Sequence, residues 1–181
     1  MSKTSAVAAK ALTSNHFELF GLVPAFALDI ARLEAAYREI QSKVHPDRFA
    51  HAGDAERRAS MQMTTRVNEA HRTLKSPVRR AKYLLELHGV DVGFETNTAM
   101  PKDFLIQQMV LREQLEAAGD AATLDFISKD LFVMKENLER EIENQIDKQG
   151  NPAGATDAVR KLMFLERFGE DIDAAYEALG A

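Results

Sequence analysis

The chain has 181 residues, no cysteine and a formal net charge of -5. Without cysteine the chain has no disulfide framework, no thiolate zinc site, no cysteine nucleophile and no cysteine-held iron–sulfur cluster. A hydrophobic fraction of 45% is enough for a packed core, and the length favours one domain or two small ones. Nine glycines and five prolines are few breakers, which favours long helices over a sandwich or barrel.

The N-terminal end is predicted to be a flexible tail, residues 1–14. Its one apolar stretch is too short and too mild for a signal peptide. No apolar run in the chain approaches the ~20 residues that a membrane span needs. The sequence therefore predicts a cytoplasmic protein with no membrane partner.

Residues 15–88 show three helical patterns after a short apolar segment over 15–22. Asp29 can cap the first long helix, and Pro46 must end it because proline disfavours helical geometry in the preceding residue. Its apolar face comprises Ile30, Leu33, Ala36, Tyr37, Ile40 and Val44. A second helix over 54–75 has the apolar stripe Ala59, Met63, Val67, Ala70 and Leu74. Pro77 opens the third helix, which ends at Gly89.

Residues 89–100 lose the apolar period and contain two glycines, which indicates a linker. Three further helices are expected in residues 101–181, over 101–118, 121–148 and 152–179. In the middle one, apolar residues recur in alternating steps of three and four, which is typical of a bundle helix. The predicted fold class is all-α: a helical hairpin module followed by a C-terminal three-helix bundle.

The string His45-Pro46-Asp47 is the most informative candidate for chemistry. A histidine and an aspartate two residues apart invite an acid–base interpretation, but a plain helix–helix turn has the same pattern. No nucleophile, glycine-rich phosphate loop or metal-spaced cluster accompanies them. The sequence therefore predicts no enzyme, no metal site and no cofactor.

The helix over 101–118 has more apolar surface than a bundle needs. Phe104, Leu111 and Leu115 share one face, and a second set spreads over the other side: Leu105, Ile106, Met109 and Val110, with Glu113 among them. This second face is either buried against the N-terminal module or is a docking patch, and periodicity favours neither. Phe164 lies a quarter turn from the core centre of the last helix, at its margin.

Charge is unevenly distributed along the chain. Residues 57–82 contain eight basic residues and one acid, whereas residues 103–147 contain eleven acids and four bases. The basic stretch suggests a nucleic-acid module as one alternative, but interleaved aromatic side chains are missing and Tyr83 stands alone nearby. A solvated surface, or a supplementary contact to an acidic protein, is favoured, so no nucleic-acid partner is predicted.

Several short strings, taken in chain order, resemble the motifs of a known family. Asn15-His16-Phe17-Glu18-Leu19-Phe20-Gly21-Leu22, Val44-His45-Pro46-Asp47-Arg48-Phe49 and Asn68-Glu69-Ala70 resemble the J-domain, the helical hairpin by which co-chaperones engage DnaK-class ATPases. The strings Ala81–Gly89, Asp103-Phe104-Leu105, Leu111-Arg112-Glu113 and Val159-Arg160-Lys161-Leu162 narrow the resemblance to HscB, the iron–sulfur co-chaperone family. The absence of a cysteine pair favours the bacterial form of that family.

The resemblance implies a chaperone-binding surface in the first module. In J-domains the His-Pro-Asp loop and the preceding helix contact the ATPase and trigger hydrolysis. By position this implies a contact set of His45, Pro46, Asp47, Tyr37, Arg38, Lys43 and Arg48. Glu34 and Glu39 stand where many J-domains have basic residues, which favours a dedicated partner, named in the family as HscA. Lys43 is equally well explained as solvated surface.

The resemblance also implies a client site in the second module. In the HscB family this helix binds the cluster-assembly scaffold IscU, and the matching residues are Leu105, Ile106, Met109, Val110, Glu113 and Phe164. Val110 and Ala117 stand where the family often has acids, which weakens the acidic part of the patch. The predicted function is delivery of the scaffold to the chaperone and stimulation of its ATPase. The alternative is a general J-domain co-chaperone for unfolded clients.

Overall fold

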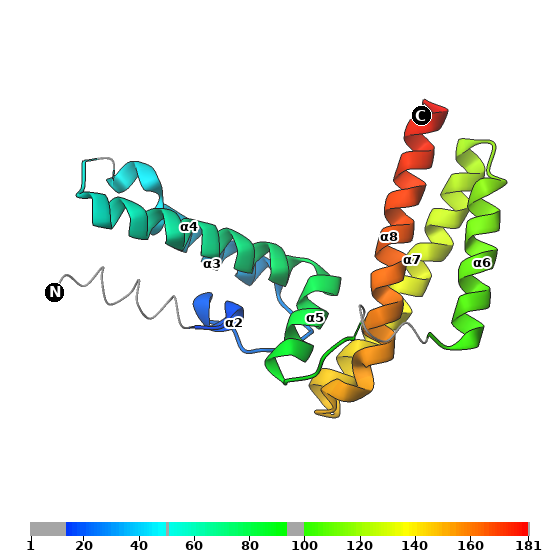
Figure 1. The fold of residues 1–181 in the computed structure, drawn as a ribbon, viewed down its shortest axis with the longest axis horizontal. Helices are drawn as coiled ribbons and strands as arrows, with labels where there is room; N and C mark the ends of the chain where they lie inside the picture. Colours follow the sequence, from blue (N-terminus) through cyan, green and yellow to red (C-terminus); the bar gives the residue numbers. More distant parts are fainter. Residues whose placement is uncertain (1–13, 50, 94–99, 181) are drawn as a thin grey trace. The chain divides into compact units, whose positions relative to one another are not determined.

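The computed structural model describes residues 14–49, 51–93 and 100–180 (Figure 1). Every regular element in these ranges is helical, and the predicted all-α class is confirmed. The chain divides into two compact units, residues 1–83 and 84–181. Residues 1–13 of the predicted tail and 94–99 of the predicted linker lie outside the described residues. The predicted domain bounds, 15–88 and 101–181, remain predictions.

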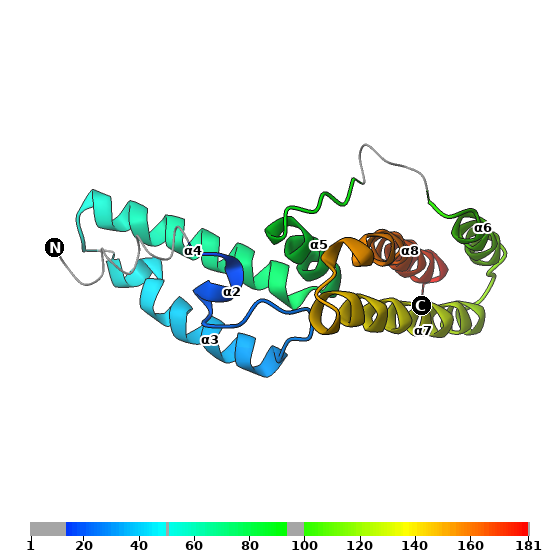
Figure 2. The ribbon, with the colours of Figure 1, turned by 90° about the horizontal axis from the view of Figure 1, so that it is seen from below.

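The first unit is built on a helical hairpin. It contains α2 (His16–Leu19), α3 (Ile30–Val44), a short 3₁₀ helix (Pro46–Phe49), α4 (Asp54–Lys75) and the first part of α5 (Pro77–Leu87). The predicted cap of α3 is confirmed, because the Asp29 carboxylate accepts from the backbone N–H of Arg32 at 3.0 Å. Figure 2 shows α3 and α4 lying side by side, with α2 against them.

The core of this hairpin contains Phe17, Leu33, Val67 and Leu74, all fully buried. Two residues of the predicted apolar faces are exposed instead of buried. Ile30 opens α3 and is 39% exposed, and Ala59 is also exposed. Ser60, one residue on, is the buried one, because its hydroxyl finds a backbone acceptor on α3. The helical period predicted burial of Ala59, whereas the residue buried at this point of α4 is Ser60.

The second unit contains a three-helix arrangement. Its helices are α6 (Lys102–Glu116), α7 (Ala121–Glu143) and α8 (Thr156–Leu179), and Figure 1 shows α7 beside α8 over their length. The predicted helix over 121–148 changes at Asn144 to one π turn, Asn144–Lys148. The predicted helix over 152–179 begins with a 3₁₀ turn, Pro152–Ala155.

The core of this bundle joins all three helices and comprises Phe104, Leu111, Ile127, Leu131, Leu165, Phe168 and Ile172. From α6 this core takes Phe104, Leu111 and the partly buried Leu115, so the other large apolar side chains of α6 are not part of it. In the described part of the chain, no helix has the length and apolarity to cross a bilayer.

Candidate functional site

The loop between α3 and α4 presents the predicted His45-Pro46-Asp47 string. His45 has φ −57° and ψ 131°, the extended geometry that a following proline favours. The backbone N–H of Asp47 donates to Nδ1 of His45 at 3.3 Å, and the Asp47 carboxylate lies 3.5 Å from the same nitrogen. The Asp47 side chain is 91% exposed and that of His45 is 50% exposed. A carboxylate is thus offered to solvent from a backbone that local contacts restrain.

The base of this loop is attached to α4. The Val44 carbonyl, at the end of α3, accepts a hydrogen bond from the Ser60 hydroxyl at 2.7 Å. The Thr64 hydroxyl lies 3.1 Å from the same carbonyl and 2.9 Å from the Ser60 carbonyl, so its one proton is shared between these two acceptors. Carbonyls at a helix C-terminus have no partner within the helix, so these bonds satisfy one of them. The Arg48 guanidinium donates to the Ser42 carbonyl at 3.0 Å and joins the loop to the same helix end.

Ser60 and Thr64 are positioning residues that the sequence interpretation missed. The available signal was two hydroxyl residues, four positions apart, beside the apolar stripe of α4. That signal is weak, since serine and threonine on a helix more often bond to their own backbone or to water. The partner that makes them informative, the Val44 carbonyl, is 16 residues from Ser60 and becomes visible in the folded hairpin.

Tyr37 faces α4 rather than the open side of α3. Its hydroxyl donates to Oδ1 of Asn68 at 2.9 Å, and its ring stacks on His71 with centroids 4.0 Å apart. Gln41 donates to the same hydroxyl at 3.1 Å. These contacts make Tyr37 a part of the hairpin packing, and its predicted role in chaperone binding stays a prediction.

The basic members of the predicted chaperone-binding set lie at the surface. Arg38, Lys43 and Arg48 are all exposed. Lys43 forms an ion pair with Glu39 at 2.6 Å, one turn earlier on α3. The pair partly neutralises Lys43, so the local positive charge beside Asp47 comes chiefly from Arg48.

Glu34 joins α3 to α4 through the Lys75 ammonium and the His71 ring. Its carboxylate lies 2.9 Å from the Lys75 ammonium and 3.1 Å from Nε2 of His71. The hydrogen bond from Lys75, followed by that from His71, holds the pKa of Glu34 below its ordinary value of 4.5. A depressed pKa in the folded state means that the ionised form contributes stability at neutral pH.

Lowering the pH is therefore expected to remove the stabilisation that ionised Glu34 provides. The stabilisation by ionised Glu34 is fully present above its unfolded pKa, near 4.5, and is lost as the pH falls through its lower pKa in the folded protein. We expect Glu34→Gln to lower the thermal midpoint at pH 7 and to leave it nearly unchanged at the acid end. Thermal unfolding followed by circular dichroism between about pH 7 and about pH 3 measures the difference. A gap between the two proteins that stays constant with pH would contradict the assignment.

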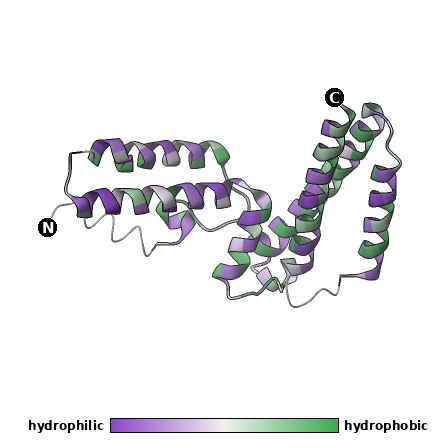
Figure 3. Ribbon diagram, turned by 45° about the horizontal axis from the view of Figure 1, so that its top comes forward, coloured by the Kyte–Doolittle hydropathy of each residue, from purple (hydrophilic) through white to green (hydrophobic). Residues whose placement is uncertain are grey.

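The second predicted surface lies on α6, opposite its core residues. The exposed fractions are 43% for Leu105, 60% for Ile106, 62% for Met109 and 45% for Val110. Figure 3 shows hydrophobic segments recurring along α6 from end to end. We call Leu105, Ile106, Met109, Val110 and Glu113 the α6 patch; all five side chains are exposed, including the carboxylate. The bundle core thus leaves the second apolar face of this helix at the surface.

Phe164 lies at the margin of the bundle core, as periodicity predicts. Its ring meets Phe104 edge to face with centroids 5.6 Å apart, and stacks on Phe168 at 6.2 Å. The Arg112 guanidinium lies over it, 5.9 Å from the centroid. Phe164 is partly buried, so the structure joins it to α6 through Phe104 and Arg112.

Arg112 and Lys161 form a basic edge that the sequence interpretation missed. The Lys161 ammonium lies over the Phe104 ring, 5.7 Å from its centre. The Arg112 guanidinium lies over the Phe164 ring in the same way. Cations over aromatic faces gain roughly 0.5–1 kcal/mol at exposed sites. The two residues are 49 positions apart in the chain, so no local pattern pairs them.

Neither surface is accompanied by metal-binding geometry. In the described ranges, no three histidine, aspartate or glutamate side chains come together as a set that could hold a metal ion. The two surfaces therefore consist of an exposed carboxylate on a restrained loop and an exposed apolar helix face. Both are suited to protein contacts.

Comparisons with known proteins agree on one family. A family model described as the HSCB C-terminal oligomerisation domain matches residues 100–173. A protein of Burkholderia multivorans named co-chaperone protein HscB homolog is 48% identical over 170 residues, which cover 93% of this chain and 97% of that protein.

Two solved structures extend the similarity to the fold. Chaperone HscB from Vibrio cholerae has a TM-score of 0.80 at 34% identity, covering 92% of this chain and 99% of that one. The crystal structure of human co-chaperone protein HscB has a TM-score of 0.85 at 28% identity, covering 90% and 82%.

Proposed function

This chain belongs to the HscB family of co-chaperones, and on that premise we propose that it binds an IscU-type scaffold protein, delivers it to an HscA-type chaperone and stimulates that chaperone's ATPase. The chain then supports transfer of an iron–sulfur cluster that other proteins hold. In this role it catalyses no reaction of its own. The proposed location is the cytoplasm, where both partners must meet it.

The observation that carries the proposal is the presence of a separate exposed surface in each unit. The first is the Asp47 carboxylate on its restrained loop. The second is the α6 patch, whose apolar members are 43–62% exposed. A contiguous patch of exposed apolar side chains on a protein usually marks a site where a partner binds.

The two surfaces support a division of labour. The α6 patch would hold the scaffold, with Phe164 and Arg112 at its edge. The loop would meanwhile place Asp47 against a basic group of the chaperone, where a charge-assisted hydrogen bond is strong. His45, Pro46, Arg38, Lys43 and Arg48 are proposed to complete that contact, and Tyr37 to hold the hairpin in shape.

Single-turnover ATP hydrolysis by the purified chaperone tests the proposal. The rate is measured alone, with this chain, with the scaffold, and with both. We expect the chain and the scaffold together to accelerate hydrolysis by more than the product of their separate effects. If a denatured model protein replaces the scaffold equally well, the chain is a general J-domain co-chaperone instead. If the chain produces no acceleration, the assignment of the ATPase role is wrong.

A further inference from the structure

The basic edge, Arg112 and Lys161, has a fixed position where α6 and α8 meet. The rings of Phe104 and Phe164 contact each other there, with centroids 5.6 Å apart. The Arg112 guanidinium, from α6, lies over the Phe164 ring of α8. The Lys161 ammonium, from α8, lies over the Phe104 ring of α6. Because each cation reaches across to a ring of the other helix, the packing of the two helices positions both charges.

The charge of the basic edge is exceptional in the second unit. Residues 84–181 contain twenty acidic and nine basic residues. Ion pairs with carboxylates occupy Lys135, Arg140, Lys148 and Arg160. Within the described ranges, the side chains of Arg112 and Lys161 form neither an ion pair nor a hydrogen bond and contact rings instead. An aromatic face attracts a cation without neutralising it, so two positive charges remain available to a partner.

The basic edge continues the α6 patch. Arg112 is exposed and follows Leu105 by seven residues, so the two lie two turns apart on nearly the same side of α6. Met109 lies between them along the helix, and Glu113 lies about 100° further round it than Arg112. Leu105 and Met109 therefore have a cation on one side and a carboxylate on the other. A partner that covers these two apolar side chains must also meet the basic edge.

The charges beside the patch give it a means of choosing a partner. Apolar side chains such as Leu105 and Met109 can cover any apolar segment, including one from an unfolded protein. A fixed charge next to them discriminates, because a segment without the opposite charge leaves that charge desolvated and unpaired. A guanidinium suits a carboxylate in particular, since its planar fork of N–H groups can donate to both oxygens. The basic edge thus fits an acidic side chain that lies next to apolar ones.

We propose that the basic edge determines the specificity of the client site by binding a carboxylate of the scaffold protein. This inference rests on the proposed function, in which the α6 patch holds the scaffold. Apolar side chains of the scaffold cover Leu105 and Met109, and an acidic side chain beside them pairs with Arg112, with Lys161 adding a second positive charge. A segment without that acid binds less tightly, so the edge separates a dedicated client from unfolded ones.

Isothermal calorimetry of the full chain against the purified scaffold, at about 50 mM and about 500 mM salt, tests the contribution of charge. At the lower salt we expect Arg112→Gln to weaken binding at least about five-fold. Arg112→Glu should weaken it at least about twenty-fold, because it opposes two carboxylates. At the higher salt both gaps should shrink, since screening weakens the pair that the variants lack. A purely structural contact between α6 and α8 would give a gap that does not depend on salt.

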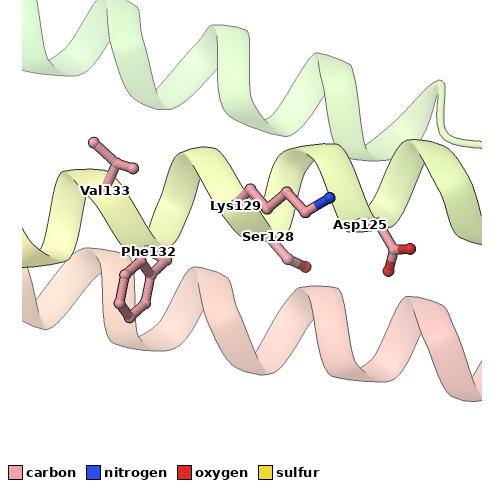
Figure 4. A pocket seen from close by; sticks show the side chains of 5 residues that line it. All are labelled: Asp125, Ser128, Lys129, Phe132 and Val133. Carbon is pink, nitrogen blue, oxygen red and sulfur yellow. The ribbon is translucent and has the colours of Figure 1, made fainter.

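Lys129 provides a matched control for the loss of one positive charge. Its side chain is exposed on α7, outside the basic edge and the α6 patch. It lines an open hollow with Asp125, Ser128, Phe132 and Val133, and Figure 4 shows all five side chains projecting from this one helix. Lys129→Gln and Lys161→Gln change the net charge equally. We expect the second to weaken scaffold binding at least about three-fold and the first to leave it unchanged.

Carbodiimide coupling identifies the group that the basic edge binds. The reagent joins a lysine amine to a carboxylate that contacts it. In a mixture of the chain and the scaffold, we expect an amide bond between Lys161 and an aspartate or glutamate of the scaffold, located by mass spectrometry. Arg112→Lys keeps the charge, supplies an amine at the other position of the edge and should give a second bond of this kind. Lys129 should give none.

The outcomes distinguish this inference from the proposed function. If the unmodified chain does not bind the scaffold, both are wrong. If it binds, and Arg112→Gln and Lys161→Gln bind equally well, the proposed function stands and the role of the basic edge is overturned. A loss that does not depend on salt, or the absence of coupling at Lys161, also overturns it. Coupling uses the unmodified chain, so its result holds even where circular dichroism shows that a variant has unfolded.

Discussion

Replacement of Asp47 by alanine is expected to lower stimulation of the partner chaperone's ATPase at least about ten-fold. The carboxylate is 91% exposed, and the Asp47 backbone N–H is bonded to His45, so the acid is presented at low entropic cost. Removing it leaves the basic group of the chaperone without a partner in a desolvated interface, which is the costly outcome for a charge. Single-turnover hydrolysis at saturating chain measures the effect.

Two control variants and a stability comparison make this result specific to the carboxylate. Asp47→Asn keeps the size of the side chain and removes its charge, so it should lose most of the stimulation as well. Glu69→Ala removes an exposed acid from α4, away from the loop, and should stimulate normally. Because the Asp47 side chain is almost fully exposed, its loss should change stability by less than about 0.5 kcal/mol. An Asp47→Ala protein that stimulates like the parent would refute the chaperone-binding assignment of this loop.

The second large effect is expected at the α6 patch. The triple variant Leu105→Ala, Ile106→Ala, Met109→Ala should weaken binding of the cluster-assembly scaffold at least about thirty-fold. All three side chains are 43–62% exposed, and alanine is a strong helix former, so α6 should remain helical. The loss would therefore reflect removed contact area. Isothermal calorimetry against the purified scaffold, compared with the unmodified chain, measures it.

A matched control lies on α7. Phe126 is an apolar side chain that is 63% exposed, like the three residues of the triple variant, and it lies outside the α6 patch. Phe126→Ala should bind the scaffold with unchanged affinity. Undiminished heat of binding in the triple variant would remove the α6 patch from the proposed function. Equal weakening by both variants would show that the scaffold contacts more than this one helix face.

The two sets of variants also report on different steps. Asp47→Ala should bind the scaffold normally, because the change lies in the loop of the first unit. The triple variant should still stimulate the chaperone alone and lose the additional acceleration given by the scaffold. Variants that fail in both assays would indicate loss of folding rather than loss of either surface.

Local signals in the sequence were sufficient to predict both ends of α3. Asp29 caps α3 as expected, because an acceptor side chain at that position satisfies a free backbone N–H whatever the rest of the fold does. Pro46 ends the same helix for an equally local reason. The separation of Phe104 and Leu111 from Leu105, Ile106 and Met109 also follows from the helical period alone.

Contacts between distant segments required the tertiary structure. The sequence named His45-Pro46-Asp47 but not Ser60 and Thr64, because a hydroxyl that satisfies a carbonyl on another helix has no signature in its own neighbourhood. Tyr37 shows the same limit: its place on α3 was predicted, whereas its stacking on His71 depends on the register of two helices. Composition, caps and period thus determined an all-α chain, and the resemblance to a known family turned the His45-Pro46-Asp47 loop and the second face of the 101–118 helix into candidate surfaces. Only the packing of the helices decided which side chains position those surfaces and which remain exposed, because burial depends on neighbours that the chain brings together by folding.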